Sequence, residues 1–229
     1  MDKLKFSELQ EALGHSFSDA HLLMRALTHR SYSAENYERL EFLGDSVLNC
    51  AASILLYNMQ PNLDEGKLSR VRSHLVKQDC LAGVGQRIKL DQMLHLGAGE
   101  VKNSSQIRDS IVADALEALI GAVLLDAGFD KACETVFRLL EPVLLESPID
   151  SLGKDPKTQL QELLQAKRLN LPVYRVLVEG GCVSSPEFKV ECRVESLMLS
   201  HVGMGLSRRV AEQKAAQALL SEIEKKGLC

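Results

Sequence analysis

The stretch from Tyr37 to Asn58, YERLEFLGDSVLNCAASILLYN, is the longest segment of the chain in which apolar residues recur at helical spacing. It predicts a long helix with one aliphatic face for a core. Three carboxylates fall on another side of that helix, within about 60° of one another on the helical wheel. They are Glu38, Glu41 and Asp45. This one segment therefore supplies both a core helix and an acidic surface.

A second acidic helix is predicted between Gln106 and Asp126. Asp114 and Glu117 lie one turn apart in it, inside a strongly apolar run. Small residues allow another helix to approach closely. Gly44 is such a residue in the first helix, although glycine lowers the helix propensity there. The small residues beside the two acids of the second helix are Ala118, Gly121 and Ala122.

A crossing of the two helices at these small residues would bring four carboxylates together. Two carboxylates about 4 Å apart repel by about 4 kcal/mol at an effective dielectric constant near 20, so four in one pocket need a cation. Oxygen ligands without His or Cys suit Mg²⁺, and also Mn²⁺. From the spacing alone, acids on solvated helix faces are the somewhat favoured alternative. The four candidate metal ligands are Glu41, Asp45, Asp114 and Glu117.

Phe42 lies on the acidic side of the first helix, about 40° from Glu38 on the wheel. A large aromatic side chain in that position indicates a contact surface, for example with a second copy of the chain. The alternative is a small satellite cluster of the core.

Residues 1–147 are expected to form an all-α domain, because no segment before residue 150 alternates with a period of two. A short polar stretch with Pro and Gly predicts a linker at 148–154. Further helices are indicated at Ala20–His29, at Glu65–Val76 after the N-cap residue Asp64, and at Lys131–Leu145.

Residues 155–226 follow a different pattern, with the order α-β-β-β-α. The alternation of apolar and polar residues is clearest between Phe188 and Glu195. The fold class is therefore mostly α, with a small mixed domain after the helical one. The expected elements are helices at Pro156–Lys167 and Ser207–Lys225 and strands at Tyr174–Glu179, Phe188–Glu195 and Leu197–Val202.

The two parts differ in charge. Residues 1–153 carry 15 Lys and Arg against 22 Asp and Glu, whereas residues 154–229 carry 12 against 9. The acidic part suits cations and the basic part suits phosphates. The six cysteines form no C-x-x-C pair, which favours reduced core thiols in a cytoplasmic protein. The N-terminus has no secretory leader pattern, and no apolar run approaches spanning length, so no membrane partner is expected.

The segment Glu38-Arg-Leu-Glu-Phe-Leu-Gly-Asp-Ser46 closely resembles the signature of the ribonuclease III family. Leu27-Thr-His-Arg-Ser31 before it and the segment from Ser110 to Gly121 are also similar to that family. The tail resembles a double-stranded RNA-binding domain at both ends, at Asp155–Glu162 and Ser207–Ala216. The resemblance covers nearly the whole chain, in the compact bacterial arrangement.

The resemblance implies a homodimeric, Mg²⁺-dependent endoribonuclease that cuts both strands of duplex RNA, leaving 5′-phosphates and short 3′ overhangs. Processing of rRNA precursors and of mRNA is implied with it. The four carboxylates named above match the metal ligands of the family, and Asp45 and Glu117 would hold the ion and the attacking water. Glu38 and Glu65 match acids that support catalysis, and Phe42 matches the aromatic residue that enters the partner subunit.

For RNA binding, the resemblance points to polar residues on the first helix of the tail and cations on its last helix. A merely solvated basic helix is the alternative. The loop 180–188 lacks the His that the family often carries there, so Ser184 or Ser185 would have to replace its contact. Tyr37 stands where the family usually has a polar residue. The candidate RNA-binding residues are Thr158, Gln161, Glu162, Arg208, Arg209 and Lys214.

Two other function classes compete with this one. A non-catalytic RNA-binding regulator would lack one of the metal carboxylates, and all four are present. A metal hydrolase for small phosphate esters would have no use for an RNA-binding tail.

Overall fold

The computed structural model describes residues 3–102, 107–146, 155–182 and 185–227, with the backbone alone at 3–5, 101–102, 179–182, 185–187 and 224. The chain divides into two compact units, Met1–Gly153 and Lys154–Cys229. The expected linker, 148–154, and the loop residue Ser184 lie outside the described residues, and of Ser185 only the backbone is described.

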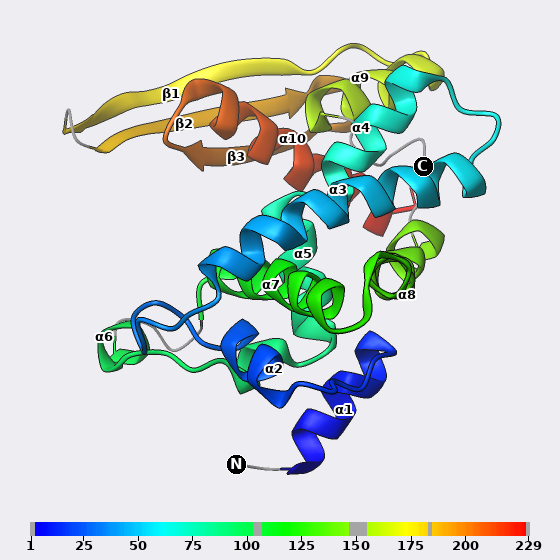
Figure 1. Cartoon of the computed structure of the whole chain (residues 1–229). Coiled ribbons are helices and arrows are strands. Elements are labelled where there is room, and N and C mark those ends of the chain that lie inside the picture. Colours follow the sequence, from blue (N-terminus) through cyan, green and yellow to red (C-terminus); the bar gives the residue numbers. More distant parts are fainter. Residues whose placement is uncertain (1–2, 103–106, 147–154, 183–184, 228–229) are drawn as a thin grey trace. The chain divides into compact units, whose positions relative to one another are not determined.

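The first unit is helical (Figure 1). Its elements are α1 (Lys3–Leu13), α2 (Ala20–Ala26), α3 (Glu38–Met59), α4 (Glu65–Leu75), α5 (Gln78–Arg87), the 3-10 turn η1 (Leu90–Met93), α6 (Ala98–Lys102), α7 (Asp109–Ala127) and α8 (Phe129–Glu146). Asp64 caps α4, because its carboxylate accepts the N–H of Lys67, as the sequence predicts.

The core of this unit forms where α3 packs on α7, and α7 is buried on nearly all sides. Leu40 and Leu48 of α3 and Leu116 and Leu119 of α7 are almost fully enclosed. The end of α7 also anchors the N-terminal segment. Asp126 accepts a hydrogen bond from His15 Nε2 at 2.7 Å and the backbone N–H groups of Ser18 and Asp19.

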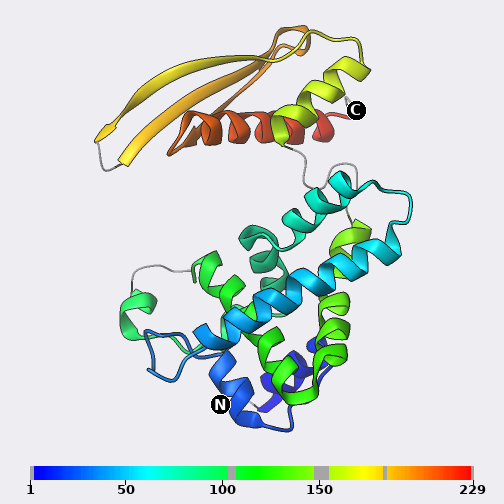
Figure 2. The ribbon, with the colours of Figure 1, turned by 45° about the horizontal axis from the view of Figure 1, so that its top comes forward.

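The second unit is a three-stranded antiparallel sheet with two helices on one face (Figure 2). The strands β1 (Val173–Cys182), β2 (Ser185–Val194) and β3 (Leu199–Gly205) lie in that order, and α9 (Pro156–Ala166) and α10 (Arg208–Lys225) cover them. Gly203 lets α10 approach β3, since a Cβ there would lie 2.1 Å from the carbonyl oxygen of Ala211. Cys192 and Leu219 are fully buried between the layers.

The predicted fold class is confirmed, with a helical unit followed by an α-β-β-β-α unit. Several details differ. Helix α2 ends at Ala26 and not at His29, because Thr28 pairs with His95 in an isolated bridge and the N–H of His29 donates to His95. Strand β3 starts later than expected, after the 3-10 turn η2 (Glu195–Leu197). Strand β1 runs on to Cys182 and β2 begins at Ser185, so both reach further into their hairpin than expected. Helices α1, α5 and α6 were not anticipated.

Two expectations about apolar residues need correction. The first is that no apolar run approaches the length of a membrane span. Among the described helices, α3 is long and apolar enough to cross a membrane, with a mean hydropathy of 1.3. Core helices pass the same test, and the aliphatic face of α3 is buried against α7. Cys133 and Cys192 are buried thiols, but Cys50 is exposed. Position 50 lies about 20° from the exposed Tyr57 on the wheel and so faces solvent.

Candidate functional site

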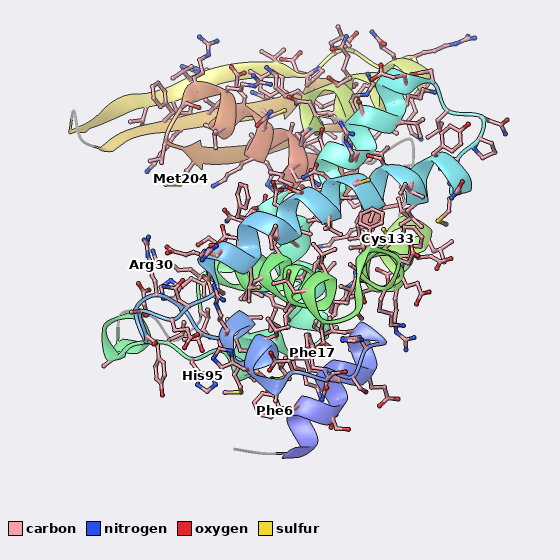
Figure 3. All side chains as sticks on the ribbon, viewed as in Figure 1. Phe6, Phe17, Arg30, His95, Cys133 and Met204 are labelled. Atoms are coloured by element: carbon pink, nitrogen blue, oxygen red, sulfur yellow. The ribbon has the colours of Figure 1, made fainter. Side chains whose placement is uncertain are left out.

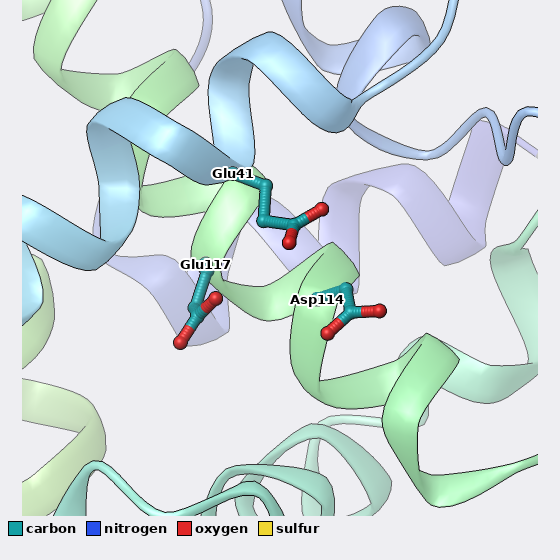
Figure 4. A group of neighbouring side chains, drawn as sticks. All are labelled: Glu41, Asp114 and Glu117. Carbon is teal, nitrogen blue, oxygen red and sulfur yellow. The ribbon is translucent and has the colours of Figure 1, made fainter.

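Three carboxylates from two helices converge in the first unit. Glu41 projects from α3, and Asp114 and Glu117 project from α7 into the same space (Figure 4). If one carboxylate oxygen is taken from each residue, the three oxygens lie within 4.8 Å of one another. All three side chains are half-buried, so they are partly withdrawn from water and still open to a ligand.

Two glycines make this convergence possible. A Cβ at Gly44 would lie 1.8 Å from the carbonyl oxygen of Glu117, and one at Gly121 would lie 2.1 Å from that of Leu40. The backbones of α3 and α7 therefore touch where the acids project. The close approach that the small residues predict is confirmed by this contact.

The pKa values in the cluster are raised. Burial, and after it the nearby carboxylates of Asp45, Glu41 and Asp114, together raise the pKa of Glu117 to about 8. Burial likewise raises the pKa of Glu41 to about 7, with Asp114 as the next cause. Burial also raises the pKa of Asp114, although His29 and Arg30 oppose it. Burial and the neighbouring carboxylates therefore outweigh the positive charge that reaches the cluster.

These residues fit a divalent metal ion. The donor atoms are carboxylate oxygens, which hard cations such as Mg²⁺ prefer. The raised pKa values, caused first by burial and then by the neighbouring carboxylates, show that the ionised groups are poorly stabilised without a cation. Asp45 lies close to the cluster, since its charge is the largest cause, after burial, of the raised pKa of Glu117. Its own carboxylate accepts a hydrogen bond from Asn49 Nδ2 at 2.8 Å, and it is not among the three converging groups.

The other two predicted acids lie apart from the three. Glu38 stands at the start of α3, where Arg30 Nη1 is 3.2 Å from its Oε1. Glu65 begins α4 and accepts a hydrogen bond from Ser69 Oγ at 3.1 Å. Glu38 contributes to the raised pKa of Glu41, whereas no described interaction joins Glu65 to the cluster.

Three residues of the loop before α3 also reach the site, and the sequence assigned none of them a role there. His29 and Arg30 act on the pKa of Asp114, and the buried Tyr37 has its pKa raised by burial and then by Asp114 and Glu41. His29 is buried, and its Nδ1 lies 2.7 Å from Ser31 Oγ. Their position in the sequence just before the acidic helix could have indicated that they lie near the site. Periodicity does not predict the path of a loop, so their contacts could not be derived from it.

A family model described as Ribonuclease-III-like matches residues 19–143, more than half of the chain. The chain belongs to the ribonuclease III family. A second model, the double-stranded RNA binding motif, matches residues 156–223. This ribonuclease III chain therefore joins the acidic cluster to an RNA-binding unit.

Relatives with the same family name match nearly the whole of this chain. Ribonuclease 3 of Variovorax paradoxus is 54% identical over 219 residues, which cover 96% of each chain. Ribonuclease 3 of Cupriavidus taiwanensis is 51% identical over 97% of this chain and 87% of its own. The solved nuclease domain of ribonuclease III from Campylobacter jejuni covers 65% of this chain and 100% of its own, with a TM-score of 0.59 and 36% identity.

In this ribonuclease III, the candidate RNA-binding residues lie on the surface of the second unit. Thr158, Gln161 and Glu162 are exposed on α9, and Arg208, Arg209 and Lys214 are exposed on α10. A network holds the two helices together: Glu212 accepts from Lys157 Nζ at 2.6 Å and from Arg208 Nε at 2.9 Å. Gln213 Nε2 donates to Asp155 at 2.7 Å. The sequence did not reveal this network.

Phe42, the predicted dimer contact of this ribonuclease III, has 75% of its surface exposed. It does not belong to a satellite core cluster, so that alternative is wrong. Tyr57, near the other end of the same helix, is exposed to the same extent.

Proposed function

We propose that this ribonuclease III is an endoribonuclease that hydrolyses double-stranded RNA with Mg²⁺ held by Glu41, Asp45, Asp114 and Glu117, and that Mn²⁺ can replace Mg²⁺. The observation that carries the proposal is the convergence of three raised-pKa carboxylates in a chain that also matches the double-stranded RNA binding motif. Family membership and the RNA-binding unit together support double-stranded RNA as the substrate.

The chemistry that follows is hydrolysis of a phosphodiester. A bound Mg²⁺ would offset the charge on the phosphate and on the attacking and leaving oxygens. The attacking water gives up a proton as its oxygen forms a bond to phosphorus. The bond between phosphorus and the 3′-oxygen breaks, and the 3′-oxygen takes up a proton to become a hydroxyl group. The phosphate stays on the 5′ end of one product.

Each carboxylate has a part in that reaction. Glu41 and Asp114 would hold the cation from two helices, because the contact between α3 and α7 brings these carboxylates together. Burial and the neighbouring carboxylates raise the pKa of Glu117 to about 8, so its carboxyl group is mostly protonated at neutral pH without a cation. With a cation bound, Glu117 would be ionised and would orient the attacking water together with Asp45. Glu38 and Glu65 support the placement of RNA or metal.

The second unit supplies affinity for duplex RNA. In this proposal Thr158, Gln161 and Glu162 face the minor groove and its 2′-hydroxyl groups. Arg208, Arg209 and Lys214 face phosphates near the N-terminus of α10, where the helix dipole also favours negative charge. The exposure of all six side chains supports these roles.

The working form is a cytoplasmic homodimer that uses Phe42 as a contact. The large exposed aromatic side chain supports this, since such a residue is costly to leave in water. A second solved nuclease domain of Campylobacter jejuni ribonuclease III (37% identical, TM-score 0.57) is described as flexible in a region involved in dimer formation. Two sites in a dimer would cut both strands and leave short 3′ overhangs, a reaction suited to processing rRNA precursors and mRNA.

One assay tests the proposal against its competitors. Purified protein is incubated with a long RNA duplex, with Mg²⁺ or with a chelator, and the products are separated on a denaturing gel. We expect fragments with 5′-phosphates only when the metal is present. Duplex that stays uncut on the denaturing gel, but is shifted by the protein on a parallel native gel, would indicate a binding regulator. Activity on small phosphate esters with an intact duplex would indicate the other hydrolase class.

A further inference from the structure

Arg30 is a cation at the edge of the acidic cluster that the proposed mechanism does not use. It lies on the loop that leads into α3 (Figure 3). Its guanidinium is 3.2 Å from Glu38 Oε1, and the two side chains are 70% and 49% exposed. Exposed ion pairs of this kind contribute little to stability, so Arg30 can leave Glu38 at small cost.

The charge of Arg30 reaches the cluster itself. It lowers the pKa of Glu41 and of Asp114, against the upward shifts that burial causes there. His29, the other nearby base, is buried, and burial lowers its pKa, so its imidazole is neutral near physiological pH. Among the described residues that act on these two carboxylates, Arg30 is therefore the one permanent cation.

A phosphate that enters this site meets several negative charges. One divalent ion offsets only part of the combined charge of four carboxylates and a phosphodiester. A guanidinium also binds phosphate through two parallel hydrogen bonds, which an exposed Arg can offer once its carboxylate partner is displaced.

We propose that Arg30 exchanges Glu38 for a backbone phosphate of the bound RNA next to the carboxylate cluster, and so contributes to substrate placement. The inference rests on the proposed function, because it takes double-stranded RNA as the ligand. In free protein Arg30 pairs with Glu38. In the complex the guanidinium of Arg30 pairs with a phosphate of the RNA.

The test compares Arg30→Ala with Arg87→Ala. Arg87 is a matched control, since it is a half-exposed arginine of the same unit whose guanidinium pairs with Glu146. RNA binding is measured by gel shift over a range of salt concentrations, with Glu117→Gln added to each protein so that the duplex stays intact. Arg30→Ala should reduce the slope of log affinity against log salt by about 0.9 per protomer, one phosphate contact. Arg87→Ala should leave the slope unchanged.

A second readout separates this role from assembly of the metal site. Mg²⁺ titrated into the otherwise native protein without RNA, followed by calorimetry, should bind Arg30→Ala at least as tightly as the parent, because a repelling cation has been removed. In cleavage assays Arg30→Ala should lower kcat/KM by about tenfold to a hundredfold, and Arg30→Lys should recover only part of the loss.

An unchanged salt slope in Arg30→Ala would overturn the proposal, and so would weaker Mg²⁺ binding. If the parent protein fails to cut duplex RNA with Mg²⁺, the proposed function is wrong. The salt slope would still report on Arg30 in that case, so the two failures are distinguishable.

Discussion

Gly44 of α3 lies directly against the backbone of Glu117 in α7, so closely that a Cβ at position 44 would be 1.8 Å from the Glu117 carbonyl oxygen. This contact joins the packing of the unit to its chemistry. The same residue that limits how near α3 can come also carries the carboxylate with a pKa raised to about 8. Any widening of this crossing would separate Glu41 from Glu117.

Gly44→Ala should therefore damage both stability and metal binding. The added methyl group meets backbone and has no flexible side chain to displace, so α3 and α7 must move apart. We expect a loss of about 2–4 kcal/mol in the free energy of unfolding and a clear weakening of Mg²⁺ binding. Denaturant unfolding and calorimetric titration measure the two effects.

Gly83→Ala is the matched control, since Gly83 lies inside α5 with open space around its Cβ position. It should stabilise the protein by about 0.5–1 kcal/mol through helix propensity alone. A Gly44→Ala protein as stable as the Gly83→Ala protein would contradict the close helix contact.

The carboxylate cluster predicts how stability without metal depends on pH. Glu41 and Glu117 have folded-state pKa values of about 7 and about 8, above their ordinary value of 4.5. For acids shifted upward, the folded state binds more protons, so the stability is fully present below the unfolded pKa and is lost as pH rises through the folded pKa. In a chelator, the melting temperature should fall as pH rises from about 4.5, the ordinary pKa of both groups, to about 8, the folded-state pKa of Glu117.

Mg²⁺ should flatten that profile, because it binds the ionised form and releases protons. Glu117→Gln should flatten it as well, since the amide does not titrate. Melting curves with chelator and with Mg²⁺ test both statements. An equally steep decline in Glu117→Gln would mean that another group causes it.

Much of the site was predictable from the sequence because helices have a fixed period. The angular positions of Glu41, Asp114 and Glu117 follow from counting residues, and Gly44 and Gly121 indicate where two helices can meet. Helix Gln78–Arg87 was not anticipated, because its apolar pattern is short and contains two glycines.

The loop before α3 shows where such reasoning stops. Arg30 pairs with Glu38, eight residues later, only because the chain turns back after α2. That turn depends on the contacts of Thr28 and His29 with His95, far along the chain. Local sequence contains no information on such a long-range contact, so Arg30 could not be placed beside the cluster in advance.

Removal of the second unit should separate affinity from chemistry. A protein that ends before Ser151 keeps the carboxylates and loses the candidate RNA-binding residues of α9 and α10. Duplex binding should weaken strongly, while Mg²⁺-dependent cutting survives at low salt, where the remaining phosphate contacts strengthen. A truncated protein that is folded and dimeric, yet inactive at low salt, would show that the second unit is needed for the chemistry.

The central claim is that the Glu117 carboxylate holds a catalytic metal ion, and Glu117→Gln tests it most directly. The amide keeps the size of the side chain and removes the charge. Gel-shift affinity and single-turnover cleavage are measured on one RNA duplex with saturating Mg²⁺, beside Glu141→Gln, which alters an exposed acid of α8. We predict that Glu117→Gln binds the duplex normally and loses cleavage by orders of magnitude, since metal charge stabilisation is worth several kcal/mol, while Glu141→Gln behaves like the parent. Cleavage by Glu117→Gln within about tenfold of the parent, a barrier change of only about 1.4 kcal/mol, would contradict the account.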